Sequence, residues 1–312
     1  MAKPTPCKRI LLILYFLLIC NLSFAQTDSA KYLFDKGYRF LSVDRTLAID
    51  YLSQCISKDS TFTQAYFHRG VCFFKNSDYK LALDDFEKAH NLNPKLSVIW
   101  MYKGFTYRNM GKTDLALNSF SQYITKNPTD TTAYSYILRG KMKYELGDFQ
   151  GAVGDYDMAI KLKPFEEKYH YYKFVALYDN GSYTKALKAV NKLTAVNPDF
   201  YGYYLYKGNV YKKLNQLDSA IYMYSISIIK NYNNADGYFY RAQTYKQKGA
   251  HHKALEDFNT AIELNPKDGS YYFQRGECKL EQDDKSGACE DWVKAGELGY
   301  DKNLDRVMKL CE

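Results

Sequence analysis

The sequence has little proline and none of the short motifs that mark common catalytic or metal-binding sites. Seven prolines among 312 residues are too few for a proline-rich disordered linker. No two cysteines have the CxxC spacing of a zinc site, the five histidines form no HExxH motif, and there is no GxSxG motif or phosphate-binding glycine loop. We therefore expect neither an enzyme nor a bound metal or cofactor.

Charge of one sign is also not concentrated anywhere in the chain. The formal net charge is +8, but lysines are scattered among acids and no basic run of five residues occurs. A nucleic-acid-binding surface would need clustered positive charge, so most charged residues are expected to form a solvated face. Tyrosine, in contrast, is abundant, with 32 residues. That aromatic content predicts a chain that is folded over nearly its whole length.

The amino terminus has the three-part plan of a secretory signal peptide. Lys3, Lys8 and Arg9 precede the apolar run Ile10–Cys20, and Ser23-Phe24-Ala25 provides small residues at a cleavage site. An uncleaved anchor is the main alternative, but about 20 apolar residues are needed to span a bilayer. Lipidation of Cys20 is a weaker alternative, because a bulky isoleucine precedes it. Cleavage after residue 25 would remove three positive charges and leave a charge of +5 on an exported chain.

A pattern of 34 residues recurs through the rest of the chain. A small residue is followed twelve positions later by alanine and, four positions after that, by a bulky side chain, usually aromatic; a proline then ends most repeats. The small residues are Gly70, Gly104, Gly140, Gly208, Ala242 and Gly276, and the aromatic ones are Phe86, Phe120, Tyr156, Tyr224, Phe258 and Trp292. Such periodicity predicts a solenoid, in which each repeat buries its apolar face against its neighbours.

Within each repeat the apolar spacing predicts two helices. Val98, Met101 and Phe105 recur at helical offsets, and Gly111 can end the first helix because glycine accepts the left-handed conformation. A second helix then runs to Asn127-Pro128, where the proline disfavours helical geometry in the preceding residue. The small residue, the alanine and the aromatic residue are predicted to be core positions at which the two helices approach closely.

These motifs resemble the tetratricopeptide repeat family over about nine tenths of the mature chain. The resemblance implies an all-α, right-handed solenoid of eight repeats over residues 26–300, followed by a capping helix over residues 301–312. Phe174 and Val190 depart from the pattern at the small and aromatic positions of the fifth repeat, and Tyr232 replaces a proline in the sixth. The repeats begin near Ala30, Thr63, Ser97, Ala133, Glu167, Tyr201, Ala235 and Gly269.

The family places a binding groove on the first helices of the repeats. The fifth, sixth and twelfth positions of those helices then give an aromatic groove with a basic fringe. Tyrosine suits such a surface because it offers a large area, few torsions and a hydroxyl group. At the fifth position we expect partial packing between repeats as well as ligand contact. The predicted groove residues are Phe67, Met101, Tyr102, Arg108, Tyr144, Tyr171, Tyr172, Tyr178, Tyr206, Lys212, Phe239, Tyr240 and Lys246.

Five cysteines remain after the predicted cleavage. The carboxyl end is similar to that of exported tetratricopeptide repeat proteins of Gram-negative bacteria, and a Cys289–Cys311 disulfide is expected to hold the terminal helix. Cys55 and Cys72 either form a second disulfide or are two separate buried thiols.

The resemblance implies a non-catalytic module that binds a protein or peptide segment in the periplasm or at the cell surface, as an adaptor or scaffold. Binding of carbohydrate through stacked tyrosines, and positioning of a separate envelope enzyme, are the alternatives. A family subset that grips a terminal carboxylate needs polar groove residues, but Phe67, Val71, Met101 and Phe105 occupy those places.

Overall fold

The computed structural model describes residues 29–127, 133–301, 307 and 309–311, and all regular secondary structure in this part of the chain is helical. The predicted signal peptide lies outside the described residues, as does most of the predicted capping helix. The helices follow one another as packed pairs, which confirms the predicted all-α repeat fold. Among the described residues, none of the helices combines the length and the apolar character needed to cross a membrane.

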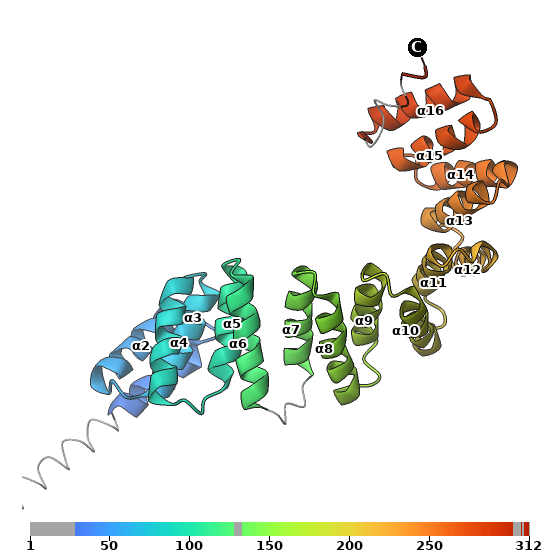
Figure 1. The fold of residues 1–312 in the computed structure, drawn as a ribbon. Coiled ribbons are helices and arrows are strands. Elements are labelled where there is room, and N and C mark those ends of the chain that lie inside the picture. The colour runs from blue at the N-terminus through green and yellow to red at the C-terminus, as the bar shows by residue number, and fades with distance from the viewer. Residues whose placement is uncertain (1–28, 128–132, 302–306, 308, 312) are drawn as a thin grey trace, which may run out of the picture. The chain divides into compact units, whose positions relative to one another are not determined.

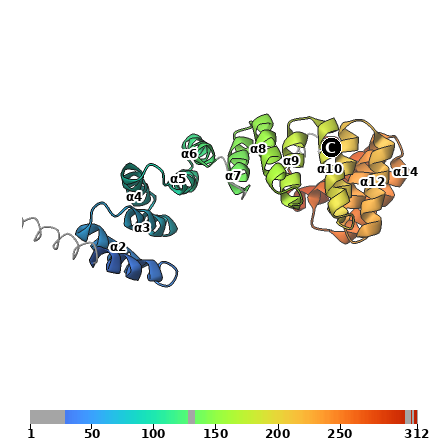
Figure 2. The same ribbon diagram turned by 90° about the horizontal axis from the view of Figure 1, so that it is seen from below.

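The chain divides into two compact units, residues 1–146 and 147–312. Consecutive helices within each unit lie next to one another in chain order (Figure 1), and the second view shows the same order for α2 to α7 of the N-terminal unit (Figure 2). The N-terminal unit has a helix over residues 29–40, then α2 (Arg45–Lys58), α3 (Thr63–Lys75), α4 (Tyr79–Leu92), α5 (Val98–Asn109), α6 (Thr113–Lys126) and α7 (Tyr134–Glu145). The C-terminal unit has α8 (Phe149–Leu162), α9 (Glu167–Asp179), α10 (Tyr183–Val196), α11 (Tyr201–Lys213), α12 (Leu217–Lys230), α13 (Ala235–Gln247), α14 (His251–Leu264), α15 (Gly269–Leu280) and α16 (Lys285–Glu297).

The two helices of a repeat approach closely at the small residue of the first helix. A Cβ atom added to Gly104 would lie 2.6 Å from Cε1 of Phe120, and one added to Gly276 would lie 2.7 Å from Nε1 of Trp292. Phe120 and Trp292 are fully buried. The aromatic side chain of the second helix therefore occupies the volume that a larger residue would need, as the repeat pattern predicts.

The fifth repeat reverses this size relationship. Phe174 stands at the small position of α9 and Val190 at the aromatic position of α10, and both are buried, at 4% and 0% exposure. α9 and α10 still pack as a pair. The departure from the sequence pattern is thus an exchange of large and small side chains between two helices, which conserves the filled volume approximately.

A residue with a positive φ lies in the turn after each of the seven first helices α3, α5, α7, α9, α11, α13 and α15. Four of the described turns use glycine here, including Gly111 with φ of 71°. Three others hold a residue with a Cβ atom in the same left-handed region: Ser77 at 68°, Asn215 at 57° and Asp283 at 62°. Asparagine and aspartate tolerate this conformation better than serine does, so Ser77 is the most strained of the three.

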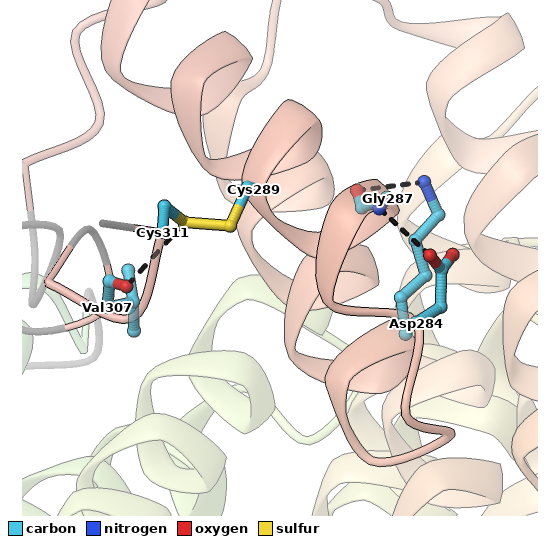
Figure 3. Close-up of a disulfide and its surroundings, with 6 residues drawn as sticks. Asp284, Gly287, Cys289, Val307 and Cys311 are labelled. Atoms are coloured by element: carbon cyan, nitrogen blue, oxygen red, sulfur yellow. Dashed lines mark hydrogen bonds between the residues drawn. A yellow bond between two sulfur atoms is a disulfide. The ribbon is translucent and has the colours of Figure 1, made fainter.

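A disulfide joins α16 to the carboxyl-terminal segment in the structure (Figure 3). Cys289 and Cys311 are bonded at an S–S distance of 2.02 Å, and the Cys311 Sγ lies 3.9 Å from the carbonyl oxygen of Val307. Val307 is buried, at 3% exposure, in the cluster that contains Trp292 and Phe273. This segment covers the apolar end of the last repeat. Cys55, Cys72 and Cys278 are buried free thiols, so the first two are separate rather than paired.

Candidate partner-binding site

The predicted groove residues are divided between the two units. Five lie in the N-terminal unit, Phe67, Met101, Tyr102, Arg108 and Tyr144, and the other eight in the C-terminal unit. All are half-buried, except for Arg108, which is exposed, and Phe239, which is buried. Each unit is therefore considered as a binding surface by itself.

In the N-terminal unit, the structure brings Phe67 and Tyr102 together. Their rings meet edge to face with centroids 5.4 Å apart, and Tyr102 also lies 5.8 Å from Phe86 of the preceding second helix. Burial raises the pKa of Tyr102. The Arg108 guanidinium lies 5.6 Å from the ring of Phe105, at the exposed end of α5. These aromatic residues mainly join one repeat to the next.

In the C-terminal unit, the sixth-position tyrosines pack in the same way. Tyr172 lies 5.8 Å from Tyr156, and Tyr240 stacks on Tyr224 at 6.0 Å between ring centroids. Tyr206 stacks on Phe174 at 5.3 Å and lies 5.7 Å from Tyr171. Each of these rings supports a neighbour and still leaves part of its surface exposed. The tyrosines thus pack against neighbouring rings in two groups, Tyr171, Tyr172 and Tyr206 in one and Tyr240 in the other, and are not isolated platforms.

A hollow of about 420 Å³ opens on the first helices α9, α11 and α13. Three of its residues, Tyr178, Lys212 and Tyr240, are among the groove residues predicted from the sequence. Four further polar residues, which were not predicted, also line it: Asn209, Lys213, Gln243 and Gln247. Asn209 and Gln243 stand at the ninth position of their repeats, three residues from both the sixth and the twelfth positions. That spacing places them on the same helical face and would have been the signal for including them.

Lys212 is the only residue of this hollow with a strongly lowered pKa. Its Nζ donates a hydrogen bond of 2.9 Å to Oε1 of Gln243. Burial, together with the positive charges of Lys213 and Lys246, lowers the Lys212 pKa to about 8. Lys246 is itself near a carboxylate, 3.7 Å from Glu281. No carboxylate of the described residues pairs with Lys212, so its charge is left without a counter-ion inside the hollow.

Two amide oxygens of the hollow, those of Asn209 and Gln243, already accept hydrogen bonds from the protein. The Tyr224 hydroxyl donates to Oδ1 of Asn209 at 2.7 Å, and Oε1 of Gln243 accepts from Lys212. The amide nitrogens of both residues remain as donors, beside the ammonium group of Lys212. A cluster of donors around one positive charge is suited to an anionic or strongly hydrogen-bond-accepting ligand group.

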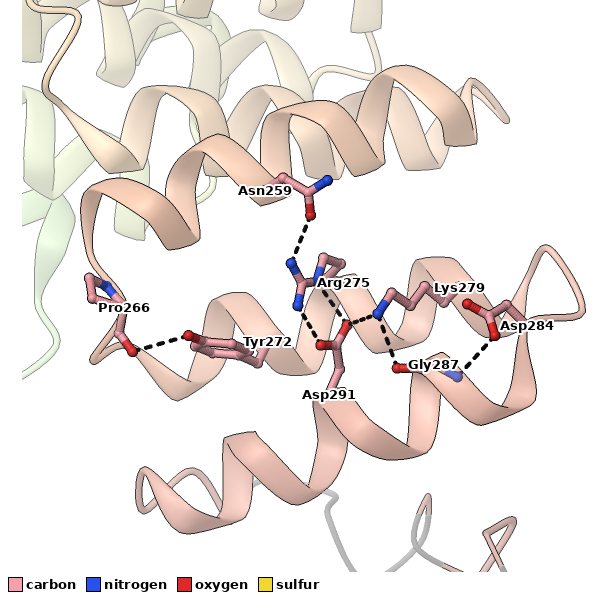
Figure 4. Close-up of polar contacts among 8 residues, drawn as sticks. All are labelled: Asn259, Pro266, Tyr272, Arg275, Lys279, Asp284, Gly287 and Asp291. Atoms are coloured by element: carbon pink, nitrogen blue, oxygen red, sulfur yellow. Dashed lines mark hydrogen bonds and ion pairs between the residues drawn. The ribbon is translucent and has the colours of Figure 1, made fainter.

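A second polar arrangement, which sequence reasoning missed, recurs between first and second helices. Arg275 donates from Nε and Nη2 to the carboxylate of Asp291 at 2.8 and 2.6 Å, and from Nη1 to Asn259 of the preceding repeat at 2.7 Å (Figure 4). Lys279 joins the same carboxylate at 3.0 Å. Equivalent pairs are Arg69–Asp85 and Arg241–Asp257.

The signal for this arrangement is present in the sequence. The arginine directly precedes the small residue of the repeat, and the aspartate follows sixteen positions later. Where the arginine is replaced by Lys103, Lys173 or Lys207, no aspartate stands at the second position. Lys103 and Lys173 reach back to the preceding second helix, to Glu87 at 2.6 Å and to Asp157 at 2.5 Å. These ion pairs connect neighbouring helices, and in each of them the carboxylate is already bound by a lysine.

Neither arrangement is a metal centre. In the part of the chain that the structure describes, no group of three or more His, Cys, Asp or Glu side chains is placed to hold a metal ion.

Comparisons with known proteins agree with this architecture. Three profiles described as tetratricopeptide repeat match residues 63–96 and 235–268, 171–236, and 100–130, together just over half of the chain. Anaphase-promoting complex subunit 3 of Schizosaccharomyces pombe is 25% identical over 187 residues, which is 60% of this chain and 28% of that protein. The chain thus spans less than a third of this curated relative.

Two solved structures show the same fold at low sequence identity. The C-terminal part of a TPR repeat-containing protein from Cytophaga hutchinsonii matches with a TM-score of 0.64 at 19% identity, over 79% of this chain and 99% of that one. A tetratricopeptide repeat protein from Parabacteroides merdae matches with a TM-score of 0.55 at 21% identity, over 80% and 98%. Proteins of this kind bind protein or peptide partners. By its repeats and its fold, the chain belongs to the tetratricopeptide repeat family.

Proposed function

We propose that this protein is a non-catalytic binding module of the cell envelope, which holds a carboxylate-bearing segment of a partner protein against the hollow of α9, α11 and α13. The observation that carries the proposal is the state of Lys212. The lysine side chain is half-buried, and its ammonium group lies among amide groups and has no carboxylate partner among the described residues. A partner carboxylate would supply the missing counter-ion.

The walls of the hollow favour a peptide. Tyr178 and Tyr240 flank Lys212 with half-buried rings, which offer apolar contact beside the charge. A sugar-binding site would present a separate aromatic face for stacking, whereas Tyr240 is already stacked on Tyr224. The relative from S. pombe is named as a subunit of a complex, and this supports a role in protein assembly.

The envelope location rests on the sequence. Lys3, Lys8, Arg9 and the following apolar run have the plan of a signal peptide, and the Cys289–Cys311 disulfide in the structure suits an oxidising compartment. In this setting the module would act as an adaptor or assembly scaffold. Fractionation of the producing cell, with detection of the cleaved amino terminus, tests the location directly.

Affinity capture with a Lys212→Met variant tests the binding site. The parent and the variant would be immobilised and exposed to envelope extract, beside a Lys248→Met control, whose exposed lysine pairs with Asp218 outside the hollow. We expect a discrete set of proteins on the parent and the control, and a loss of at least tenfold on Lys212→Met. Equal retention by all three would move the binding surface elsewhere. Retention of glycans rather than proteins would replace the proposal with carbohydrate binding.

A further inference from the structure

A second hollow, on the second helices of the C-terminal unit, is not used by the proposed function. It has a volume of about 430 Å³ and is lined by α8, α9 and α10. Leu177 and Tyr178 are adjacent in α9, but Leu177 lines this hollow whereas Tyr178 lines the one described above. The two hollows therefore lie on different faces of the same helix.

The hollow lies where the arginine–aspartate pairing is interrupted. In the repeats of Arg241 and Arg275, the guanidinium and the aspartate fill the space between the first and second helices. The fifth repeat has Lys173 and Ala189 at these positions. Lys173 extends to Asp157 of α8 instead, at 2.5 Å, so this pair lines the hollow from α8 and α9, and only the short side chain of Ala189 faces the hollow from the position of the aspartate.

The floor of this hollow is apolar. Val153 and Ile160 of α8, Leu177 of α9 and Ala189 of α10 line it. Leu177 is 2% exposed and Ala189 is 8% exposed, so the floor is held in place by the core beneath it. An apolar recess of this kind can accept one or two aliphatic side chains.

The rim of the hollow is positively charged. Lys185, Lys188 and Lys192 line it from α10, at a spacing that puts them on one helical face. All three are exposed, and no described carboxylate pairs with them. α10 contains no Asp or Glu, whereas each of α2, α4, α6, α8, α12, α14 and α16 has at least one. Asp157 lines the hollow too, but it is already paired with Lys173.

We infer that this hollow is a second docking site, which takes an acidic protein segment with aliphatic side chains among its carboxylates. The three lysines of α10 would face the carboxylates, and the aliphatic side chains would enter the recess over Leu177 and Ala189. Charge complementarity selects the partner, because the rim has a surplus of positive charge and its only carboxylate is neutralised. The apolar floor favours such a segment over a phosphate backbone, which has no aliphatic group to place there. With sites on both faces, the C-terminal unit could hold two partners at once.

Fluorescence anisotropy with a synthetic probe tests this inference. The probe is a labelled peptide in which two leucines stand among six glutamates; one matched peptide replaces the leucines by serine and another replaces the glutamates by glutamine. We expect the full-length protein to bind the first peptide at least tenfold more tightly than either matched peptide. Failure to bind it, or equal binding of the serine peptide, would overturn the inference.

Three variants locate the binding on the protein. Lys185→Gln/Lys188→Gln/Lys192→Gln removes the rim charge, and Ala189→Met fills the recess without changing charge; each is expected to weaken binding at least tenfold while the circular dichroism spectrum is retained. The control variant removes the same charge from three exposed lysines outside the hollow, namely Lys161, Lys253 and Lys267. If the control variant weakens binding as much as the rim variant does, the peptide is attracted only by the overall positive charge of the protein, and the inference is wrong.

The other ligands are distinguished in the same assay. A single-stranded oligonucleotide that binds more tightly than the peptide, with the same dependence on the α10 lysines, would assign the site to nucleic acid and contradict the inference. Lys212→Met is expected to leave binding of this peptide at the hollow of α8, α9 and α10, here called the outer site, unchanged. The two proposals are therefore tested separately. The proposal for the outer site can be contradicted while the Lys212 site is supported, and the Lys212 site can be contradicted while the outer site is supported.

Discussion

Arg241 and Asp257 form a bidentate ion pair, in which Nε and Nη2 of the arginine each donate to one carboxylate oxygen at 2.8 Å. Nη1 of the same arginine donates to Ser225 of the preceding repeat at 2.9 Å. One side chain therefore connects the two helices of its own repeat to the second helix of the repeat before it. In a solenoid, contacts between neighbouring repeats supply much of the stability.

We predict that Asp257→Ala destabilises the C-terminal unit by about 2–3 kcal/mol, because it leaves a largely buried guanidinium without its partner. The double variant Arg241→Met/Asp257→Leu should lose much less stability, because neither buried charge remains. Urea unfolding followed by circular dichroism measures both. Equal losses in the single and double variants would show that packing, rather than the unpaired charge, causes the effect.

Because a large and a small side chain are exchanged at Phe174 and Val190, we predict that a second substitution at Phe174 restores stability lost by enlarging Val190. Val190→Phe alone should destabilise the protein by about 1–3 kcal/mol, because Phe174 already occupies the space between α9 and α10. The double variant Phe174→Gly/Val190→Phe restores the arrangement of the other repeats and should regain at least half of that loss. Additive losses in a thermal unfolding series would contradict this explanation of the fifth repeat.

Ser77 offers a stabilising substitution. Its φ of 68° lies in the left-handed region, where a Cβ atom costs about 1 kcal/mol and glycine has no such cost. Ser77→Gly should therefore raise the free energy of unfolding of the N-terminal unit by about 0.5–1 kcal/mol. Asn215→Gly is the matched control in the other unit and should gain less, because asparagine tolerates this conformation. A loss of stability in Ser77→Gly would contradict the assignment of strain.

The lowered pKa of Lys212 predicts a specific pH dependence of stability. Its pKa is about 8 in the folded protein, below 10.5, the ordinary value of lysine, so the unfolded chain binds more protons between these limits. The parent should gain stability relative to Lys212→Met as the pH rises through this window, and Lys212→Met should be the more stable of the two at pH 7. Comparison of the two proteins is needed because tyrosines such as Tyr271, whose pKa is raised by burial and by Asp236, titrate above this range.

Lys212 is surrounded by groups that do not provide a counter-charge. Lys213 lies on its own helix, Lys246 and Tyr240 on α13, and Tyr178 on α9. A bound carboxylate should therefore raise the Lys212 pKa, and a partner that binds here should bind more weakly as the pH rises above about 8. The free protein and the complex can be compared by NMR of the lysine ε-carbon. An unchanged pKa on binding would place the partner away from Lys212.

The Cys289–Cys311 disulfide predicts a local effect of reduction. Closure of a loop of this length stabilises a chain by about 3 kcal/mol in the chain-entropy model. Cys289→Ser/Cys311→Ser should expose Val307 and Trp292 to hydrogen exchange, whereas residues of the N-terminal unit should exchange as before. Intact-protein mass with and without reductant establishes whether the bond is formed in the purified protein.

Much of the fold could be predicted from the sequence because the residues that define the repeat have a direct steric role. Gly104 and Phe120 mark the close approach of two helices, and Gly111 marks a turn that needs a positive φ. The positions at which a repeat departs from this pattern were harder to interpret. Phe174 and Val190 depart from the pattern individually, and only the packed helices show that the two changes compensate for each other.

The candidate site was less accessible from sequence. The groove prediction selected residues by repeat position and thus included Tyr178, Lys212 and Tyr240, but it omitted the amide residues Asn209 and Gln243. Whether a groove residue is open also depends on its neighbours, as Phe239 is buried by Tyr271 at 4.6 Å between ring centroids. The hollow of α8, α9 and α10 depends on Ala189, which stands where other repeats have an aspartate. This difference is visible only when the repeats are compared with one another.

Site-specific photo-cross-linking from the hollow of α9, α11 and α13 tests the central claim most directly. A benzoylphenylalanine would replace Gln247, an exposed residue of this hollow, and Tyr222, which is 64% exposed on α12, would carry the control label. Irradiation in envelope extract should give discrete cross-linked proteins from position 247 and not from position 222, and Lys212→Met should abolish them. The same products from both positions, or products that persist in Lys212→Met, would contradict binding of a partner at Lys212.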